Sequence, residues 1–518
     1  MMKFHQKSIH SVRYLSSDVR TGPIAKKIAA EGDREQQGMD RLRARTGLPL
    51  ASYFSGTKVR WLVENVPQLH SDLMSDTERS NVRIGTIDTW LVYQLTGRTG
   101  TSCSSADDSS GSSATVVTSD DASSFNSTFP KGNIGGLFVT DVTNASRTLF
   151  MDIETCQWCK DLVYEVLRMQ AFPVDTALAK IEPSSCVYGS CSGECSSGII
   201  SAAYSYLKGV PIASILGDQQ AALFGQVCFE KGTAKCTYGT GLFLMMNTGP
   251  DIVPSVHGLL TTVAYKIGSE ATVYGLEGSV AFSGSVIQWL RDQLDIISDA
   301  AESETLAIQV QSNDGLYFVP AFAGLFAPYW RSDARGVIAG MTASHTKHHI
   351  CRAALEATAY QAKEVFDAMY HDSHISLASL RVDGGAVANN LLMQFQADML
   401  DVPVVKPQVA ETTATGAAFA AGLAIGVWKD LSEIHQMWAV DKDWKPTMPT
   451  DIRNLYFKGW KKAVTKSFGW VEQDAEINVD EETQTQTDKY FTRGCLFMVA
   501  AASVLSVTGY TLLRSKKV

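Results

Sequence analysis

The sequence lacks any dense run of lysine and arginine in its body, and acidic residues outnumber basic ones. Its 518 residues contain 45 Lys and Arg against 54 Asp and Glu, giving a formal net charge of −9. A nucleic-acid-binding surface needs concentrated positive charge, so this balance argues against one. The chain is too long for one compact core, and we expect two domains with appendages.

The chain also lacks the paired cysteine motifs of a structural zinc site. Cys156 and Cys159 have the spacing of one zinc-binding pair, but Cys186, Cys191 and Cys195 supply no second pair. We therefore interpret these thiols as incidental and predict no metal site. The ten cysteines are scattered through a chain without a secretory leader, which indicates reduced thiols in the cytosol.

Aliphatic residues almost disappear between residues 97 and 135, where Ser, Thr and Asp dominate. Such a composition cannot bury a core, so the pattern predicts a disordered surface insertion. Phosphorylation of the insertion is an alternative to a passive role.

One long uncharged run occurs near the end, at residues 495–513, after an acidic stretch at 471–494. A helix of this length spans close to the ~30 Å hydrocarbon core of a bilayer, which predicts a membrane anchor. A buried core helix is the alternative. The basic tail of Arg514, Lys516 and Lys517 favours the cytosolic face of the mitochondrial outer membrane, with the cytoplasm as the alternative localisation.

The stretch 216–243 carries the clearest chemical signal. Asp218 follows an apolar, strand-like run and precedes an Ala-rich helical pattern, which suits a catalytic base next to a glycine. A helix N-cap is the alternative for Asp218. The segment 237–243 (TYGTGLF) predicts a tight hairpin whose backbone N–H groups and hydroxyls can hold phosphate oxygens. Together the two halves indicate phosphoryl transfer to a hydroxyl.

Repeated units of strand, glycine turn and helix predict an α/β protein. A second turn of this kind, at 383–390, lies in the other half of the chain, and a ligand in an interdomain cleft would touch both turns. The patterns predict helices at 59–66, 89–95, 286–294, 349–371, 391–400 and 412–426, and strands at 210–216, 258–265, 317–320, 380–382 and 402–405.

Eight stretches, in order along the chain, resemble glycerol kinases of the carbohydrate-kinase family. They are YFSGTK (53–58), GTIDTWL (85–91), TDVTNASRT (140–148), GDQQAALFG (217–225), TYGTGLF (237–243), IQWLRD (287–292), APYW (327–330) and DGGAVANN (383–390). The resemblance implies a two-domain actin-like or ribonuclease-H-like ATPase fold with an interdomain cleft. The hydrophobic tail is similar to that of animal glycerol kinases.

The resemblance also implies a role for each matched residue. Asp218 would be the general base that takes the proton of the attacking glycerol hydroxyl, while Tyr53, Gln219 and Phe243 would bind or enclose glycerol. ATP and Mg²⁺ are the implied cofactors, with nucleotide-binding positions at Thr240, Gly284, Gln288, Gly385 and Asn389. An exposed helix position for Gln288 and a helix-start role for Asn389 are the structural alternatives.

Two elements of the family pattern are not found. Members begin with an Asp-x-Gly-Thr-Thr turn that binds phosphates and positions Mg²⁺, and a later Arg-Glu pair grips glycerol, whereas the match here begins near Asp18. This predicts a truncated first domain. The expected organisation is a non-family segment 1–17, an N-terminal kinase domain 18–227, a nucleotide-binding domain 228–470, a linker 471–494 and a membrane anchor 495–513.

The leading hypothesis is a membrane-tethered glycerol kinase that converts glycerol and ATP to sn-glycerol 3-phosphate and ADP. A catalytically impaired, membrane-anchored binding or scaffold protein of the same fold is the first alternative, because of the missing elements. A kinase for another polyol is the second. The formation of a homo-oligomer is left open.

Overall fold

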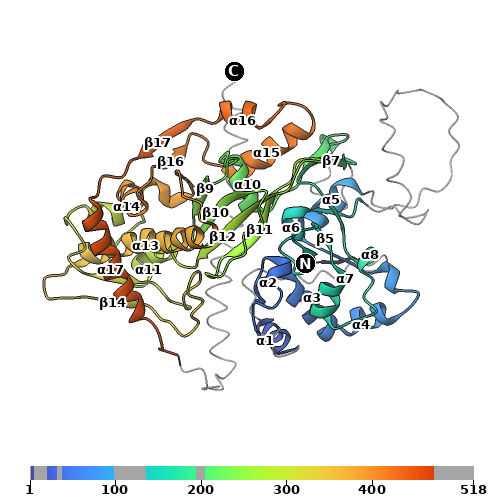
Figure 1. The fold of residues 1–518 in the computed structure, drawn as a ribbon, viewed down its shortest axis with the longest axis horizontal. Helices are drawn as coiled ribbons and strands as arrows, with labels where there is room; N and C mark the ends of the chain where they lie inside the picture. Colours follow the sequence, from blue (N-terminus) through green and yellow to red (C-terminus); the bar gives the residue numbers. More distant parts are fainter. Residues whose placement is uncertain (1, 5–19, 32–37, 98–135, 194–204, 472–518) are drawn as a thin grey trace. The chain divides into compact units, whose positions relative to one another are not determined.

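The computed structural model describes residues 2–4, 20–31, 38–97, 136–193 and 205–471 (Figure 1). The chain forms two compact units, Met1–Phe468 and Gly469–Val518, and every labelled element lies in the first. The insertion predicted at 97–135, the linker at 471–494 and the anchor at 495–513 fall outside the described residues except at their edges. The predicted segment 1–17 is described only at residues 2–4.

A seven-stranded mixed sheet forms the centre of the second half. Its spatial order is β11 (Leu260–Tyr265), β12 (Val273–Val280), β10 (Leu242–Gly249), β9 (Ala234–Tyr238), β15 (Leu380–Asp383), β16 (Val404–Pro407) and β17 (Val440–Trp444). β9, β15 and β16 are parallel to one another, whereas the other neighbours are antiparallel. The predicted hairpin is therefore confirmed, with residues 239–241 as the turn between β9 and β10.

Successive side chains of a strand point to opposite sides of a sheet, and here the two sides differ in chemistry. The apolar face carries Ala234, Cys236, Tyr238, Leu244 and Met246, all buried in one core. Residues from three helices complete this core: α13 (Lys347–Ser373), α14 (Asn390–Leu400) and α17 (Thr450–Thr465).

The opposite side, called the polar face below, carries Lys235, Thr237, Phe243, Met245 and Glu277. Strand register places them together, because Phe243 pairs with Thr237, and Met245 pairs with both Lys235 and Glu277. Met245 packs in a cluster with residues of α10 (Asp218–Gly225) and α15 (Thr412–Ala424). The charged side chains of this face are buried, so their partners determine what the face can do.

Helices α10 and α15 approach each other through glycines. A Cβ atom on Gly225 would lie 1.9 Å from the Thr412 carbonyl oxygen, and one on Gly416 would lie 1.8 Å from that of Ala221. The small-residue helix predicted at 412–426 therefore serves close packing. This contact holds α10, the helix that begins at Asp218, against the second half of the chain.

The first half has its own hydrophobic core among helices and short strands. In α3 (Ser55–Asn65), Val59, Leu62 and Val63 recur at helical spacing and are buried, as the sequence predicts. The elements are β1 (Met2–Phe4), α1 (Gly22–Ala30), α2 (Arg43–Thr46), α3 (Ser55–Asn65), α4 (Pro67–Met74), β2 (Arg83–Gly85), α5 (Ile87–Thr96), β3 (Val139–Asp141), α6 (Val142–Ala145), β4 (Met151–Asp152), β5 (Gln157–Trp158), α7 (Lys160–Leu167), α8 (Val174–Ala177), β6 (Lys180–Glu182), β7 (Ser185–Ser190) and β8 (Pro211–Ser214).

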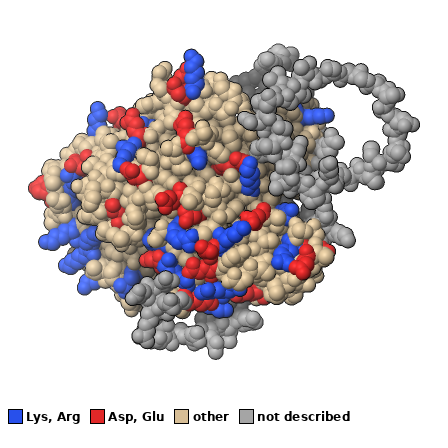
Figure 2. Space-filling view, turned by 45° about the vertical axis from the view of Figure 1, so that its right-hand side comes forward, with Lys and Arg blue, Asp and Glu red and all other residues tan. Residues whose placement is uncertain are grey.

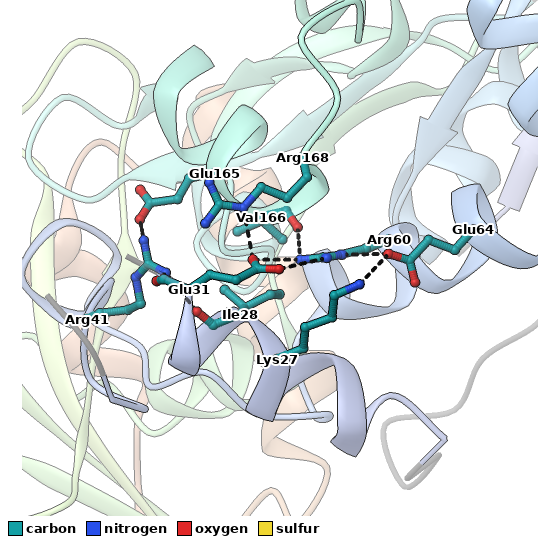
Figure 3. Close-up of polar contacts among 9 residues, drawn as sticks. All are labelled: Lys27, Ile28, Glu31, Arg41, Arg60, Glu64, Glu165, Val166 and Arg168. Carbon is teal, nitrogen blue, oxygen red and sulfur yellow. Dashed lines mark hydrogen bonds and ion pairs between the residues drawn. The ribbon is translucent and has the colours of Figure 1, made fainter. Parts of the chain in front are cut away.

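Figure 3 shows the ion-pair network that joins the end of α1 to α3 and α7. Arg60 of α3, whose side chain is 2% exposed, donates from Nε to Glu64 at 2.9 Å and from Nη1 to Glu31 at 3.2 Å. Arg168 donates to Glu31 at 2.9 Å. Burial opposes the charge of Glu31, but the hydrogen bonds from the two arginines lower the pKa of Glu31 overall. The network therefore fixes three helices of the first core with paired charges.

Most predicted elements are confirmed, with shifts of a few residues at their ends. The predicted helices correspond to α3, α5, α11 (Gly284–Asp292), α13, α14 and α15, and the predicted strands to β8, β11, β13 (Tyr317–Val319), β15 and β16. The remaining elements are α12 (Glu302–Ala307), β14 (Val337–Ala339), η4 (Gly385–Ala388) and α16 (Leu431–Met437), with η2 (Arg79–Asn81) in the first half.

Within the described part of the chain, every helix is too short or too polar to span a bilayer. The surface in Figure 2 carries acidic and basic side chains that often lie next to one another. The electrostatic field over this face is consequently mixed in sign.

Candidate functional site

The site is built around the N-terminus of α10. Gly217 is the N-cap residue, and Asp218 is the first helical residue, with an exposed side chain. The Asp218 carboxylate accepts a hydrogen bond from the backbone N–H of Gln219 at 2.9 Å. The N-cap alternative for Asp218 is therefore wrong, and the carboxylate stands at the positive end of the helix dipole, facing solvent.

A chain of hydrogen bonds from the first half holds the residue before Asp218. The backbone N–H of Gly217 donates to Thr143 Oγ1 at 2.8 Å, and that hydroxyl donates to buried Asp141 at 2.8 Å. Asp141 also accepts from the backbone N–H of Asn144 at 2.9 Å and from the Ser184 hydroxyl at 2.8 Å. Burial nonetheless raises the pKa of Asp141 overall. The first half thus fixes where α10 begins.

Gln219 reaches back to the polar face of the sheet. Lys235 is fully buried, and its ammonium group donates to Gln219 Oε1 and, at 3.1 Å, to Thr237 Oγ1. Phe243 is half-buried and directly opposite Thr237 in the sheet. Of the predicted glycerol-binding residues, Gln219 and Phe243 are therefore brought to one patch of the sheet by Lys235 and Thr237.

Tyr53 comes to the same area from the loop before α3. The guanidinium of Arg147 lies 5.9 Å from the centre of the Tyr53 ring and makes two hydrogen bonds to Glu277, at 2.8 and 3.1 Å. Desolvation raises the pKa of Tyr53, and the charges of Glu277 and Asp218 add to this while Arg147 opposes it. Tyr53 is thus within electrostatic reach of Asp218 and is linked through Arg147 to β12.

The turn between β9 and β10 packs against the start of α11. The Gly239 carbonyl accepts from the Gly284 N–H at 3.1 Å, and the Thr240 carbonyl accepts from the Ser283 N–H at 3.0 Å. The Thr240 side chain is exposed. A Cβ atom on Gly241 would lie 2.2 Å from a neighbouring carbonyl oxygen, so this position requires glycine. The turn brings two predicted nucleotide-binding positions, Thr240 and Gly284, together.

The second glycine turn lies beside the first, because β9 and β15 are parallel neighbours. Gly384 has φ +95°, and a Cβ atom there would lie 2.4 Å from the carbonyl oxygen of Tyr238. Asp383 is buried and accepts from the side chains of Gln226 at 3.0 Å and Thr412 at 2.6 Å. Asp383 therefore stabilises the fold, while the following Gly385 is exposed, with open space around it.

The structural alternatives for two predicted nucleotide-binding residues are observed. Asn389 is the N-cap of α14, and its Oδ1 accepts from the Leu392 N–H at 2.9 Å. Gln288 is an exposed residue of α11. The cap uses only the oxygen of the Asn389 amide and leaves its nitrogen free to bind a ligand. An exposed Gln288 could likewise bind a ligand. Both nucleotide-binding assignments therefore stay predictions.

No group of three or more His, Cys, Asp or Glu side chains suited to a metal ion occurs among the described residues. Magnesium is usually held by one or two carboxylates, phosphate oxygens and water. Mg²⁺ therefore stays an expectation from the family resemblance, as the ion that accompanies a bound nucleotide. Cys156, Cys159, Cys186 and Cys191 are free thiols, and Cys195 lies outside the described residues.

Three residues at the site were not assigned a role from the sequence: Lys235, Arg147 and Glu277. Lys235 carries the one usable signal, because residues 234–238 alternate between apolar and polar side chains with period two. That pattern predicts a lysine and a threonine on one side of a strand. The residues that Lys235 and Thr237 contact are distant along the chain, so the sequence does not predict these contacts.

Comparison with known families gives the same picture of two halves. Residues 5–118 and 127–225 match the N-terminal domain of the FGGY family of carbohydrate kinases, and residues 234–425 match its C-terminal domain. Among curated proteins, the glycerol kinase of Chloroflexus aggregans is 50% identical over 455 residues, which cover 88% of this chain and 79% of that protein. Glycerol kinase 2 of Streptomyces avermitilis is 50% identical over 88% of this chain and 78% of its own length.

Solved structures show the same similarity. The crystal structure of Plasmodium falciparum glycerol kinase with ADP aligns with a TM-score of 0.75 and 31% identity, covering 90% of this chain and 81% of that one. Xylulose kinase from Lactobacillus acidophilus aligns with a TM-score of 0.69 at 19% identity, covering 90% of this chain and 81% of that one. At that identity the second alignment is evidence for the fold alone.

Proposed function

Because this chain belongs to the FGGY family of carbohydrate kinases, we propose that it is an ATP-dependent glycerol kinase that forms sn-glycerol 3-phosphate and ADP. The glycerol kinase prediction made from the sequence motifs is confirmed by 50% identity to curated glycerol kinases over most of the chain. The single observation that carries the proposed chemistry is the exposed carboxylate of Asp218, placed beside Gln219 at the polar face.

The proposed reaction needs little covalent chemistry from the protein. Asp218 accepts the proton of the terminal glycerol hydroxyl while the hydroxyl oxygen forms a bond to the γ-phosphorus. The bond from that phosphorus to the bridging oxygen breaks, and ADP leaves with the electron pair. Gln219 and Tyr53 orient the glycerol hydroxyls, and Phe243 covers the carbon chain. Fixed positions matter most here, because phosphoryl transfer depends on alignment and charge stabilisation.

The nucleotide would lie along the two glycine turns. Thr240 and Gly284 are supported by the backbone hydrogen bonds that join residues 239–240 to residues 283–285, and Gly385 by its open surroundings. Gln288 and Asn389 complete the proposed set by resemblance to the family. When bound with ATP, Mg²⁺ neutralises charge on the phosphates.

The experiment is an acceptor panel. Phosphoryl transfer from ATP is measured with glycerol, xylulose and dihydroxyacetone for this chain and for a version carrying the family's Asp-x-Gly-Thr-Thr turn at its N-terminus. Preferred turnover of glycerol by this chain supports the proposal. Turnover only by the extended version would favour the impaired-protein alternative for these residues, and preference for xylulose would favour a kinase of another polyol.

We also propose, from the sequence alone, that residues 495–513 anchor the chain to the cytosolic face of the mitochondrial outer membrane. The support is the uncharged run followed by Arg514, Lys516 and Lys517. Cell fractionation of the full chain and of a chain ending at residue 470 tests this. Equal amounts of the full chain and the shortened chain in the soluble fraction would contradict the proposed membrane anchor. Light scattering of the same two chains measures whether a homo-oligomer forms.

A further inference from the structure

Lys235 is an unusual residue for the middle of a sheet. It lies in β9, is 0% exposed, and has apolar neighbours on both sides in the chain, Ala234 and Cys236. A buried ammonium group loses its hydration, so it is tolerated only with several partners. Its partners are side-chain oxygens of the polar face, Gln219 Oε1 and Thr237 Oγ1.

Burial lowers the pKa of Lys235 overall, and the negative charges of Asp383, Glu277 and Asp218 oppose this shift. Lys235 therefore stands among the carboxylates of three elements, at the end of β15, in β12 and at the start of α10. A methionine of similar length would fill the same space without any of these interactions.

The contact with Gln219 fixes the orientation of an amide. An ammonium group can only donate hydrogen bonds, so the Gln219 atom that faces it must be the carbonyl oxygen. The amide nitrogen, Nε2, is then the end left to interact with a ligand. Without a donor at position 235, the amide could turn over and present its oxygen instead.

This orientation matters because of Asp218, which precedes Gln219. A carboxylate accepts hydrogen bonds only, and the oriented amide offers a donor. One acceptor and one donor together match a hydroxyl group, which gives its proton to the first and receives a hydrogen bond on its oxygen from the second. An amide turned the other way would put two acceptors side by side and would repel the hydroxyl oxygen.

We propose that Lys235 is a positioning residue that orients the Gln219 amide, so that Nε2 donates to the acceptor hydroxyl beside Asp218. The proposal rests on the proposed function for the identity of glycerol as acceptor. Lys235 acts through Gln219 and does not itself touch the acceptor. A lysine that only stabilises the sheet would change stability without changing acceptor affinity.

A double-mutant cycle tests the pathway. Lys235→Met is expected to raise the glycerol KM about tenfold, the scale of a lost hydrogen bond to a charged group, with the ATP KM changed less than about twofold. Gln219→Ala also raises the glycerol KM, and Lys235→Met added to it should change that KM by less than about twofold, because its target is gone. If the two substitutions instead raised the glycerol KM independently, so that their fold-changes multiplied in the double variant, the proposal would be overturned.

Cys236→Ala is the matched control, because Cys236 is the next residue of β9, is equally buried, and points to the apolar face. It should lower the melting temperature and leave the glycerol KM unchanged. An equal rise in glycerol KM for Cys236→Ala and Lys235→Met would assign a structural role to Lys235 and contradict the proposal.

Crystal structures separate this proposal from the proposed function. If glycerol is not the acceptor, the parent shows no glycerol turnover, yet the orientation of Gln219 can still be compared between parent and Lys235→Met. A Gln219 side chain that keeps its position and contacts in the variant would overturn the proposal. Gln219→Glu gives a second test that leaves Lys235 paired: it removes the donor Nε2 and should raise the KM of whichever acceptor the parent uses by about tenfold.

Discussion

The two faces of the central sheet are made from the same strands but have different roles: one packs in the hydrophobic core, and the other lies at the proposed active site. On the apolar face, Cys236 and Leu244 are buried against α13 and the helices around it. On the polar face, the neighbouring residues Lys235 and Phe243 lie near the start of α10, among carboxylates and hydroxyls. One residue along a strand therefore separates a packing position from a position at the proposed active site.

The difference shows how a rigid site can be built on a sheet. Large side chains on the apolar face fix the strands, because close packing leaves them little freedom to shift. The polar face then presents charged groups whose positions are set by hydrogen bonds across elements, such as Arg147 with Glu277 and Thr143 with Gly217. Variants on the two faces should consequently separate stability from activity.

The largest effect is expected for Asp218→Asn. The amide keeps the shape of the side chain but cannot take the proton of the attacking hydroxyl, so kcat should fall by about 10²–10⁴-fold. The side chain is exposed, so the melting temperature should change little. Initial rates of glycerol 3-phosphate formation and a thermal melt measure both. A variant that keeps more than half of the parent rate would remove Asp218 from the role of base.

The next largest effect is expected for Gly384→Ala, which combines a positive φ with a Cβ 2.4 Å from the Tyr238 carbonyl oxygen. The turn must move away from β9, and the ATP KM should rise about tenfold, since a positive-φ strain alone is worth about 1–3 kcal/mol. Gly426→Ala is the matched control, with φ +76° and open space around its Cβ. Equal changes in ATP KM for both variants would show that the turn plays no special part.

A smaller effect on activity should distinguish Met245→Ala from Leu244→Ala. Both residues are fully buried, so each variant should lose about 2–5 kcal/mol of unfolding free energy. Met245 packs in the cluster that holds Leu223 and Phe224 of α10, whereas Leu244 packs in the core of the apolar face. Only Met245→Ala should therefore raise the glycerol KM. A rise of about threefold is expected, which corresponds to about 0.7 kcal/mol of binding free energy.

Denaturant unfolding and steady-state kinetics on the two variants give this comparison directly. A glycerol KM that rises equally in both would mean that the two faces are not separable.

No effect on activity is expected for Glu356→Gln in α13, which should change only the pH dependence of stability. Burial raises the pKa of Glu356 to about 7, although Arg352 and Asn313 each donate to its carboxylate at 2.8 Å. Between pH 4.5 and about 7 the folded state holds a proton that the unfolded state has lost. This contribution to stability is complete below pH 4.5 and disappears as the pH rises through about 7.

Melting temperatures across this range should fall less steeply with rising pH in Glu356→Gln than in the parent. Parallel curves for the two proteins would show that Glu356 does not titrate in this window. The glycerol KM serves as the control and should be the same for both at each pH.

The regular elements and the two glycine turns of this protein could be predicted from the sequence. Periodic apolar residues mark α3 and α13, and the glycines around Thr240 and after Asp383 mark the two turns, because only glycine fits a positive φ or a close backbone approach. The position of Asp218 after a strand and before a helix likewise indicates a site. These signals are local, so a single stretch of sequence contains them.

The contacts that give the site its geometry could not be predicted. Lys235 meets Gln219 across 16 residues, Gly217 meets Thr143 across 74, and Arg147 meets Glu277 across 130. Each pair forms only when separate elements pack, and many other polar residues of the chain have the same local pattern. For the same reason, the sequence could not decide that Asn389 caps a helix, which depends on where α14 begins.

The most direct test of the proposed site is a crystal structure of this protein with glycerol and a non-hydrolysable ATP analogue. We expect glycerol at the polar face, with a terminal hydroxyl between the Asp218 carboxylate and the Gln219 amide nitrogen, and the triphosphate along the turns at Thr240 and Gly385. Glycerol bound away from Asp218, or a Gln219 amide that presents its oxygen to glycerol, would contradict it.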